Sequence, residues 1–441
     1  MPESFSARQL IGCALAIGLL LTGCRGATQA PAWSQRSLIA GPEILVRLWR
    51  KTPFTQVQLS WDGTPLLAVD ANGEIIPLPQ VNRLYFYQRG EQVALAFKAG
   101  RKAAREAQAY SSLVLRVPGS EVKAFTVLIP EYGRRRNYGA QAVSLSVKYG
   151  HLALINHLPL EMYLARVLPE EMDPEHFTLE ALKAQAVVAR TWSLTNLNRH
   201  ARYGYHFCDG PHCQAYRGRK RVSGRAEDAV KMTLGEVVLS GGEPAEAFYH
   251  STCGGNTAFV EDVWPGARLP YLRRVEDRFR PGQRAYCAHS PYSRWTLWTS
   301  LRHVERVLKR RQAIAAETNL LDVKVDAVNR SGRVLRIWLA TDRGELTLGG
   351  ESFRAWLNEE FGRKLLSTFY SIRVEDGQFK LEGKGLGHGV GMCQWGARGM
   401  AQLGFSYQDI LQHYFPGTTI GRFEGAAVEP GATTVNSHAG K

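Results

Sequence analysis

An acidic segment, LPLEMYLARVLPEEMDPEHF (158–177), contains the side chains best suited to proton transfer. Within it, Glu171 is flanked by the apolar residues Leu168 and Met172. A carboxyl group in apolar surroundings has a raised pKa, so it keeps its proton near neutral pH and can pass it to a substrate. The segment contains the glutamates Glu161, Glu170, Glu171 and Glu175, and the apolar flanks of Glu171 make it one candidate for such an acid. The alternative is that Glu171 favours the start of the following helix, where negative charge is stabilised.

Cysteine and histidine residues are concentrated in a second segment, HFCDGPHCQAY (206–216). Thiolates and imidazoles are the ligands that zinc prefers, and Cys208 and Cys213 are separated by four residues. A Cys208–Cys213 disulfide and free thiols are the alternatives. The segment lacks the His-Glu-x-x-His spacing of the metalloprotease helix, which argues against a zinc hydrolase.

A third segment, GKGLGHGVGMCQWGARGM (383–400), has glycine at every second position from Gly383 to Gly391. Alternating glycines remove the side chains from one face of an extended segment, so that another backbone or a ligand can approach closely. The spacing matches neither the phosphate-binding loop nor the dinucleotide-binding fingerprint. His388 and Gln394 lie within this segment. The alternative is a glycine-rich strand bent by bulges.

Hydrophobic periodicity predicts the elements that position these segments. Alternating apolar residues predict strands over 42–160, including a hairpin at 143–154. A helical repeat predicts a long helix over 178–200 with Thr178 as its N-cap. Residues 290–370 combine two helices with alternating strands. The predicted fold class is α+β: a β-rich core, a long helix after the acidic segment, which we expect to be a catalytic loop, and an inserted α+β subdomain.

The N-terminus predicts export. An apolar run over 10–21 is too short to span a membrane and is typical of a signal-peptide core. It ends in Leu21-Thr22-Gly23-Cys24, which resembles a bacterial lipobox, so we expect cleavage before Cys24 and a lipid on that cysteine. An uncleaved anchor and a plain secretory signal are the alternatives. No later stretch is apolar enough to cross a bilayer. We therefore expect a lipid-anchored protein on the periplasmic or extracytoplasmic face of the cell envelope.

The chain is strongly basic. Its net charge is +15, and basic residues are concentrated at 134–136, 217–225 and 309–311. Outside the cytoplasm we expect no nucleic-acid partner, whereas an anionic wall polymer or a membrane surface fits this charge. A solvated basic face is the alternative.

Four blocks of the chain carry a resemblance to a known family. They are LPLEMYLARVLPEEMDPEHFTLEALKAQAVVARTW (158–192), HFCDGPHCQAY, AFYHSTCGGNTAFVEDVWPGARLPYL (247–272) and the glycine-rich segment. Their order and wording resemble the SpoIID/LytB family, the sporulation protein D and amidase-enhancer group of peptidoglycan proteins. The resemblance covers about residues 42–422. Its most specific matches are Pro-x-Glu-Met, Leu-Lys-Ala-Gln-Ala, His-Ser-x-x-Gly-Gly and Gly-His-Gly-Val-Gly-Met-x-Gln-x-Gly-Ala.

The resemblance implies a lytic transglycosylase, which cuts glycan strands between N-acetylmuramic acid and N-acetylglucosamine. Such an enzyme uses the sugar's own C6 hydroxyl in place of water and leaves a 1,6-anhydro end. One carboxyl group can then act first as the acid and afterwards as the base, whereas an ordinary glycosidase needs two. Glu171 matches the family's catalytic glutamate, so we expect it to be this acid, and Glu170 lies at a variable family position, where we expect a solvated side chain. This chemistry requires no cofactor, and relatives named for sporulation favour strands without stem peptides.

The resemblance also implies the other site residues. Lys183 and Arg190 are two helical turns apart and share a face, from which they would orient Glu171 or bind substrate; a solvated helix flank is the alternative. The expected cleft wall comprises Tyr249, His250, His388 and Gln394, with the rings of Trp264 and Trp395 beside them. The alternative for His388 is a satisfied core histidine. Glu161 matches a family position at which we expect a structural pair with a base.

A metal site follows from the same resemblance. The family often has His-x7-Cys-x4-Cys here, which His200, Cys208 and Cys213 match, so a structural zinc stands beside the disulfide and free-thiol alternatives. Of the seven cysteines, five remain after the signal peptide and the lipid-bearing cysteine are set aside. An odd number leaves at least one thiol free or metal-bound in an oxidising compartment. Cys253 and Cys393 lie in the cleft motifs, where a bond between them is a further alternative.

The expected organisation is a signal peptide (1–23), a lipidated spacer (24–41), the first part of the core (42–290), the α+β insert (291–372), the glycine-rich C-terminal part of the core (373–424) and a disordered tail (425–441). The expected partners are peptidoglycan strands and, through the lipid, a membrane. The main alternative function is a non-catalytic, wall-binding enhancer of a partner amidase. An enhancer needs no protonated carboxyl group in a cleft.

Overall fold

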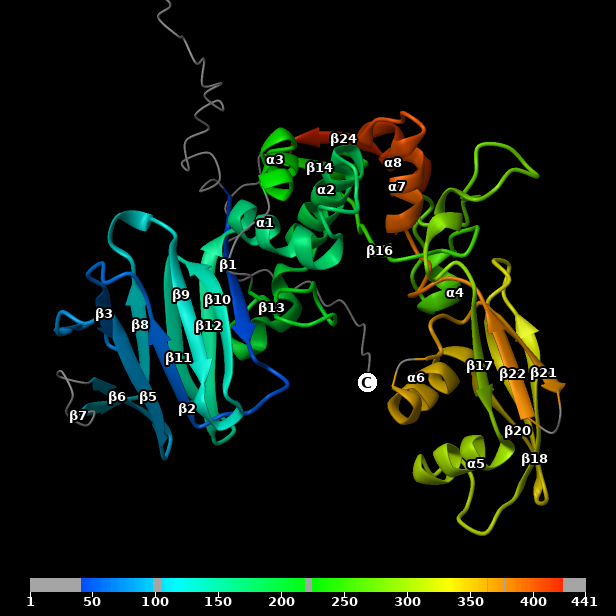
Figure 1. Ribbon diagram of the computed structural model, residues 1–441, viewed down its shortest axis with the longest axis horizontal. Helices are drawn as coiled ribbons and strands as arrows, with labels where there is room; N and C mark the ends of the chain where they lie inside the picture. Colours follow the sequence, from blue (N-terminus) through cyan, green and yellow to red (C-terminus); the bar gives the residue numbers. More distant parts are fainter. Residues whose placement is uncertain (1–40, 98–104, 219–223, 363, 376–377, 423–441) are drawn as a thin grey trace, which may run out of the picture.

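The structure is a computed structural model that describes residues 41–97, 105–218, 224–362, 364–375 and 378–422 (Figure 1). The expected signal peptide, the lipid site at Cys24, nearly all of the spacer and the tail from 425 lie outside the described residues. The described part is a mixed α+β structure, as the sequence predicts. Within it, no helix has the length and apolar character needed to cross a membrane.

The N-terminal part consists of two sheets that pack against each other over one hydrophobic core. The first sheet has the order β13-β1-β12-β11-β8-β3-β4, and the second has the order β10-β9-β2-β5-β6-β7. Their strands are β1 (Glu43–Leu48), β2 (Gln56–Ser60), β3 (Leu67–Asp70), β4 (Ile75–Ile76), β5 (Arg83–Arg89), β6 (Gln92–Phe97), β7 (Arg105–Tyr110), β8 (Ser112–Arg116), β9 (Lys123–Ile129), β10 (Arg134–Ala140), β11 (Ala142–Lys148), β12 (His151–Pro159) and β13 (Phe207–Cys208). The predicted hairpin is formed by β11 and β12, with Leu145 opposite Leu154.

A helical layer follows the sheets and continues the same core. It consists of α1 (Leu160–Glu171), α2 (Leu179–Thr195), α3 (Gly224–Met232), α7 (Gln394–Gln402) and α8 (Tyr407–Tyr414), together with the sheet β15-β14-β24. The strands of that sheet are β14 (Glu236–Ser240), β15 (Glu243–Pro244) and β24 (Thr419–Arg422). The long helix predicted from 178 is α2, and the Thr178 hydroxyl accepts a hydrogen bond from the Ala181 N–H at 3.4 Å, which confirms the predicted N-cap.

The inserted subdomain has its own hydrophobic core (Figure 1). It contains β17 (Trp295–Thr299), α5 (Leu301–Arg310), β18 (Leu320–Val328), β19 (Val334–Thr341), β20 (Gly344–Gly349), α6 (Gly350–Phe361), β21 (Tyr370–Glu375) and β22 (Gln378–Gly383). These strands form the sheets β18-β19-β20 and β17-β22-β21. Because β22 pairs with both β17 and β21, the subdomain extends to Gly383, beyond the boundary at 372 that we expected.

The glycine-rich segment turns repeatedly instead of forming one extended strand. Gly385, Gly387, Gly389 and Gly391 all have positive φ angles, a conformation that other residues rarely adopt. The segment ends in β23 (Met392–Cys393), which pairs in parallel with β16 (Tyr249–His250). A Cβ atom on Gly391 would lie 2.2 Å from the Phe248 carbonyl oxygen. The glycines therefore allow close approach, as expected, and the approaching group is a neighbouring backbone segment.

Candidate functional site

Glu171 occupies the C-terminal end of α1, so it is not in a loop and does not begin the following helix. The side chain is half-buried. Its Oε1 atom accepts a hydrogen bond from the Ala215 N–H at 2.6 Å, and its carboxyl group is hydrogen-bonded to the Tyr249 hydroxyl. The negative end of the helix dipole also disfavours a charged carboxylate here.

Burial is the largest influence on the Glu171 carboxyl group, and it raises the pKa of that group. The hydrogen bonds from Ala215 and Tyr249 and the positive charge of Arg217 act in the opposite direction, because they stabilise the carboxylate. The site therefore favours the protonated acid while still offering two donors to the carboxylate that forms when the proton leaves. Both forms are needed by a group that gives up a proton and later takes one back.

Tyr249 is supplied by β16, whose register opposite Met392 ties it to the end of the glycine-rich segment. Burial raises the pKa of Tyr249 well above its ordinary value, so the hydroxyl keeps its proton and can donate it to Glu171. Tyr163 also lies near Glu171 and is fully buried, and its ring stacks on Phe207 and Tyr216. Among the described residues, the Tyr163 hydroxyl has no hydrogen-bond partner.

His388 positions Tyr249. Its Nε2–H donates to the Tyr249 carbonyl oxygen at 3.0 Å, and its Nδ1 accepts from the Val390 N–H at 3.1 Å. Burial lowers the pKa of His388 to about 4, which agrees with a neutral ring. Both ring nitrogens of His388 are hydrogen-bonded to backbone groups. We therefore infer that His388 positions Tyr249 and does not make the expected contact with substrate. The Trp264 ring lies beside it, with centroids 5.0 Å apart.

His250 and Gln394 are both buried. His250 hydrogen-bonds through Nδ1 to the Val390 carbonyl oxygen at 3.1 Å, and its Nε2 has no partner among the described residues. Gln394 donates from Nε2 to Gln185 Oε1 at 3.3 Å. The glycine-rich segment therefore brings these residues together with Tyr249 and His388, although their side chains mainly contact other protein groups.

Arg190 and Lys183 do not join this group. The Arg190 guanidinium is 1 % exposed and forms a paired salt bridge with Glu161, with both N···O distances 2.7 Å. The Arg190 guanidinium also donates to the Glu236 carbonyl oxygen, so it is surrounded by other protein groups. The predicted contact of Arg190 with substrate is therefore wrong, whereas the structural role expected for Glu161 is confirmed. Lys183 pairs with Glu180 at 2.6 Å, on the side of α2 that faces Tyr407.

The cysteine and histidine segment forms a compact group, here called the loop cluster, of His200, Cys208, His212 and Cys213. One ligand atom from each residue lies within 4.8 Å of the others. The two Sγ atoms are 3.4 Å apart, and Cys213 Sγ is 3.4 Å from His200 Nε2. Neither cysteine is in a disulfide. Two thiols and two imidazoles are a common tetrahedral zinc donor set, so the residues fit the expected metal. His212, which the family spacing does not include, is the additional ligand candidate.

The loop cluster lies directly before the group that contacts Glu171. Ala215, whose N–H donates to Glu171, is two residues after Cys213. The thiols of Cys208 and Cys213 share a hydrogen bond, which lowers the pKa of Cys208 and raises the pKa of Cys213. Any ion held here would therefore fix the start of the segment that supplies one of the two donors to Glu171.

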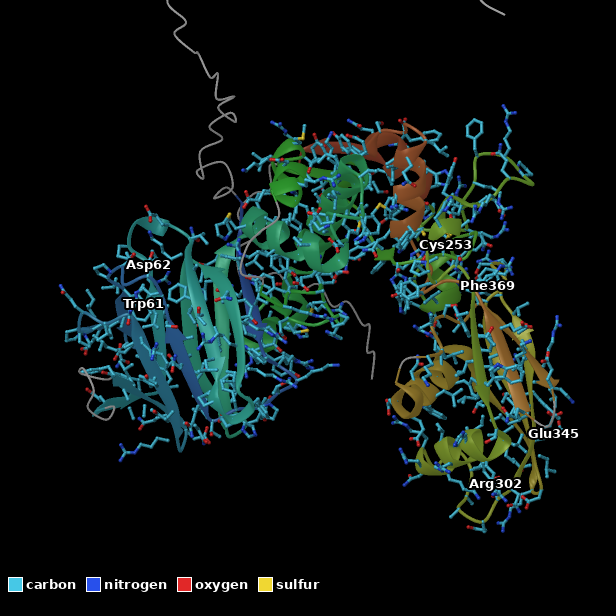
Figure 2. All side chains as sticks on the ribbon, in the orientation of Figure 1. Trp61, Asp62, Cys253, Arg302, Glu345 and Phe369 are labelled. Carbon is cyan, nitrogen blue, oxygen red and sulfur yellow. The ribbon has the colours of Figure 1, made fainter. Side chains whose placement is uncertain are left out.

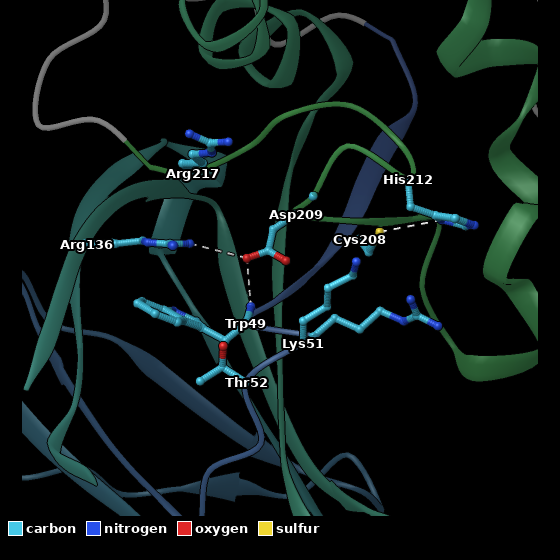
Figure 3. A pocket seen from close by; sticks show the side chains of 10 residues that line it. Trp49, Lys51, Thr52, Arg136, Cys208, Asp209, His212 and Arg217 are labelled. Atoms are coloured by element: carbon cyan, nitrogen blue, oxygen red, sulfur yellow. Dashed lines mark hydrogen bonds and ion pairs between the residues drawn. The ribbon is translucent and has the colours of Figure 1, made fainter. Parts of the chain in front are cut away.

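A basic pocket of about 160 Å³ opens beside the loop cluster (Figure 3). Its charged lining includes Arg50, Lys51, Arg136 and Arg217, together with the carboxylate of Asp209. Asp209 accepts from the Trp49 N–H at 2.9 Å and pairs with Arg136 at 3.4 Å, as the dashed lines in Figure 3 show. Arg217 also influences Glu171 electrostatically. The basic pocket thus has an excess of positive charge and shares one arginine with the surroundings of Glu171.

Comparisons with known proteins match two parts of the chain. A family model described as stage II sporulation protein (SpoIID) matches residues 148–239, the part that contains Glu171 and the loop cluster. A model of a domain of unknown function matches residues 283–391, which correspond closely to the inserted subdomain.

Three relatives extend this likeness. An uncharacterized protein of Brachyspira hyodysenteriae is 32% identical over 270 residues, which are 61% of this chain and 68% of that protein. Stage II sporulation protein D of Bacillus subtilis is 29% identical over 303 residues, covering 64% of this chain and 80% of the relative. The amidase enhancer of Bacillus subtilis is 29% identical over 292 residues, but these are only 40% of its own length.

Proposed function

Because the chain belongs to the SpoIID/LytB family of peptidoglycan proteins, we propose that it is a lytic transglycosylase acting on the glycan strands of peptidoglycan. The observation that carries this proposal is the state of Glu171. Its carboxyl group is half-buried with a raised pKa, and it contacts one N–H and one hydroxyl donor. A general acid that must later act as a base needs these properties.

The proposed reaction uses Glu171 twice. In the first step, its proton passes to the glycosidic oxygen as the bond from that oxygen to C1 of N-acetylmuramic acid breaks. In the second step, the C6 hydroxyl of the same sugar attacks C1 and gives its proton to the Glu171 carboxylate. The products are a free hydroxyl on the leaving sugar and a 1,6-anhydro end, with no water consumed. Ala215 and Tyr249 stabilise the carboxylate between the two steps.

The basic pocket supports an anionic substrate. N-Acetylmuramic acid carries a lactyl group, which ends in a free carboxylate when the stem peptide has been removed. Arg136 and Arg217 could bind such a carboxylate through paired N–H donors. We therefore propose that strands in which this lactyl carboxylate is free, the denuded strands, are the preferred substrate. Charge reversal at Arg217 would then weaken the binding of denuded strands most.

The test is digestion of purified glycan strands, with and without stem peptides, by the wild type and by Glu171→Gln. We expect 1,6-anhydro products from the wild type and a loss of about 10²–10⁴-fold in rate for the variant, the usual contribution of a positioned general acid. Products are identified by mass spectrometry, and strand binding by both proteins is measured in parallel. Equal rates for the two proteins, or no products from a wild type that binds strands, would contradict the proposal.

The second candidate function is enhancement of a partner amidase, which the likeness to the amidase enhancer favours. In this case the chain would bind the wall without cutting it. Adding a cell-wall amidase to the same assay distinguishes the two functions. A true enhancer would increase release of stem peptides equally in the wild type and in Glu171→Gln, because no proton transfer by Glu171 is involved.

The expected metal and anchor complete the proposal. His200, Cys208, His212 and Cys213 would hold a structural zinc, which would make the segment before Ala215 rigid and take part in no step of the reaction.

The lipid on Cys24 would hold the protein at a membrane of the cell envelope, close to its polymeric substrate. Metabolic labelling with a radioactive fatty acid, compared between the wild type and Cys24→Ser, tests the anchor.

A further inference from the structure

A second group of potential metal ligands lies away from Glu171 and is here called the sealed cluster. It consists of Cys253, Asp277, Cys287 and Cys393, all of which are buried. One ligand atom from each residue lies within 4.8 Å of the others. The four residues come from distant parts of the sequence, and Figure 2 shows Cys253 where the helical layer meets the inserted subdomain.

Backbone N–H groups converge on the sulfur atoms of the sealed cluster. The Cys253 N–H donates to Cys393 Sγ at 3.2 Å, and the Gly396 N–H donates to the same atom at 3.3 Å. The Gly255 N–H donates to Cys253 Sγ at 3.4 Å. Such donors stabilise thiolates, the form of cysteine that binds metals.

The Asp277 carboxyl group is held in a fixed orientation next to the three thiols. Asp277 is fully buried. One carboxylate oxygen accepts from the Tyr414 hydroxyl at 2.5 Å, and the other accepts from the Cys287 N–H at 2.9 Å. A buried carboxylate held in this way needs a nearby positive charge. Fixed outer partners of this kind are also typical of residues that bind metals.

Arg333, in the turn between β18 and β19, brings a positive charge close to two of the sulfur atoms, those of Cys253 and Cys393. Its side chain is 2 % exposed, and Nη2 donates to the carbonyl oxygens of Cys253 and Asn256 at 2.9 and 3.0 Å. It forms no ion pair among the residues that the structure describes. Burial lowers its pKa to about 10, while the sulfur atoms of Cys253 and Cys393 oppose that change, so it remains charged at neutral pH.

A disulfide accounts for this arrangement less well than a metal does. A disulfide can join only two of the three thiols, so it leaves the third thiol and the buried Asp277 carboxylate without the positive charge that a metal ion would supply. All three cysteines are free, so the bond between Cys253 and Cys393 considered from the sequence is not formed. Cys253 and Cys287 have Sγ atoms 3.6 Å apart. Ligands at about 2.3 Å from a tetrahedral zinc ion are separated by about 3.7 Å, which agrees with this spacing.

We propose that Cys253, Cys287, Cys393 and Asp277 form a second, structural zinc site that joins the glycine-rich segment to the loop before the inserted subdomain. Binding replaces the thiol protons with one Zn²⁺ ion, and Arg333 offsets part of the remaining negative charge. The site lies next to β16 and β23, because Cys393 pairs with His250 and Cys253 is four residues after Tyr249. Zinc there would hold Tyr249 in place for its contact with Glu171.

The test is the zinc content of the full chain, loaded with zinc and desalted, by elemental mass spectrometry. We expect about two zinc ions per wild-type chain and about one in Cys208→Ser/Cys213→Ser, which removes only the loop cluster. Because that variant leaves the sealed cluster intact, its result does not depend on whether changes to the sealed cluster fold. Cobalt bound to the same variant should show the visible absorption of tetrahedral thiolate coordination. Ser290→Ala, a buried neighbour that is not a ligand, serves as the matched control.

Three results would overturn the proposal. The first is a folded Cys208→Ser/Cys213→Ser protein, judged by circular dichroism, that holds neither zinc nor thiolate-bound cobalt. The second is a peptide containing a Cys253–Cys287 disulfide after non-reducing digestion of the zinc-loaded chain. Retention of about two zinc ions by Cys253→Ser/Cys287→Ser would also contradict it, because the second ion would then lie elsewhere.

Discussion

The loop cluster and the sealed cluster contain similar ligands but differ in exposure and in spacing along the chain. In the loop cluster, His212 is exposed and all four residues lie within 200–213. In the sealed cluster, every residue is buried, and Cys253 and Cys393 are 140 residues apart. Each cluster nevertheless adjoins the segment that supplies one of the two donors to Glu171. The loop cluster precedes Ala215, and the sealed cluster borders the strand that carries Tyr249.

This difference indicates separate tasks. A cluster formed within one loop can order only that loop, whereas a cluster that joins distant segments holds parts of the fold together. We therefore expect damage to the sealed cluster to appear mainly as lost stability. Damage to the loop cluster should appear mainly as lost activity, since it displaces one donor while the core stays packed.

The largest effect is expected for Cys253→Ser/Cys287→Ser. Loss of a buried metal site leaves Asp277 and Arg333 without their compensating partners, so the free energy of unfolding should fall by about 4 kcal/mol. Urea unfolding followed by tryptophan fluorescence measures this. Ser290→Ala is the control and should cost about 1 kcal/mol. An unchanged unfolding midpoint for the double variant would show that the sealed cluster does not hold the fold together.

A smaller loss of stability, about 2 kcal/mol, is expected for Cys208→Ser/Cys213→Ser, together with a 10- to 100-fold fall in kcat, roughly the effect of losing a supporting metal contact. The reason is displacement of the Ala215 N–H from Glu171. The exposed His212 should also let a chelator remove this zinc first, so zinc release from the wild type should have a fast and a slow phase. Full activity in the double variant would break the link between the loop cluster and Glu171.

Tyr249→Phe removes the second donor and should lower kcat about 10-fold, the usual value of a hydrogen bond to a charged group. Because the Tyr249 hydroxyl lowers the pKa of Glu171, its loss should move the alkaline limb of the pH–rate profile to higher pH. Tyr163→Phe is the matched control, since its hydroxyl has no hydrogen-bond partner among the described residues. An identical pH profile for both variants would argue against the Tyr249 contact.

The smallest effect concerns the stability of Glu171→Gln. The pKa of Glu171 is raised by folding, so its contribution to stability is complete below the unfolded pKa and is lost as pH rises through the folded pKa. The glutamine variant should therefore gain stability relative to the wild type as pH increases, and the two proteins should be alike in acid. Urea midpoints over a pH series measure this difference. A constant difference at all pH values would contradict the raised pKa.

The sequence predicted features that depend on nearby residues. Local periodicity located α2 and its N-cap, the hairpin of β11 and β12, and the inserted α+β subdomain. The close spacing of Cys208 and Cys213 was also sufficient to suggest a metal site. The apolar flanks of Glu171 predicted a raised pKa, although they did not show that the residue ends a helix.

Features that depend on distant contacts were not predictable in this way. The partner of Arg190 is Glu161 on another helix, and no spacing rule connects the two. His388 uses both nitrogens for backbone groups that only the fold brings near. The sealed cluster requires the return of the chain at 393 to the neighbourhood of 253, and Cys287 carried no local signal at all. An odd number of cysteines was the one hint of an unpaired thiol.

The central claim is that Glu171 passes a proton to the glycosidic oxygen and that the sugar's own hydroxyl, not water, completes the cut. Digestion of denuded strands in ¹⁸O-labelled water tests this most directly. The account predicts 1,6-anhydro ends without ¹⁸O from the wild type and few products of any kind from Glu171→Gln. Reducing ends that carry one ¹⁸O atom would mean hydrolysis and would contradict the account.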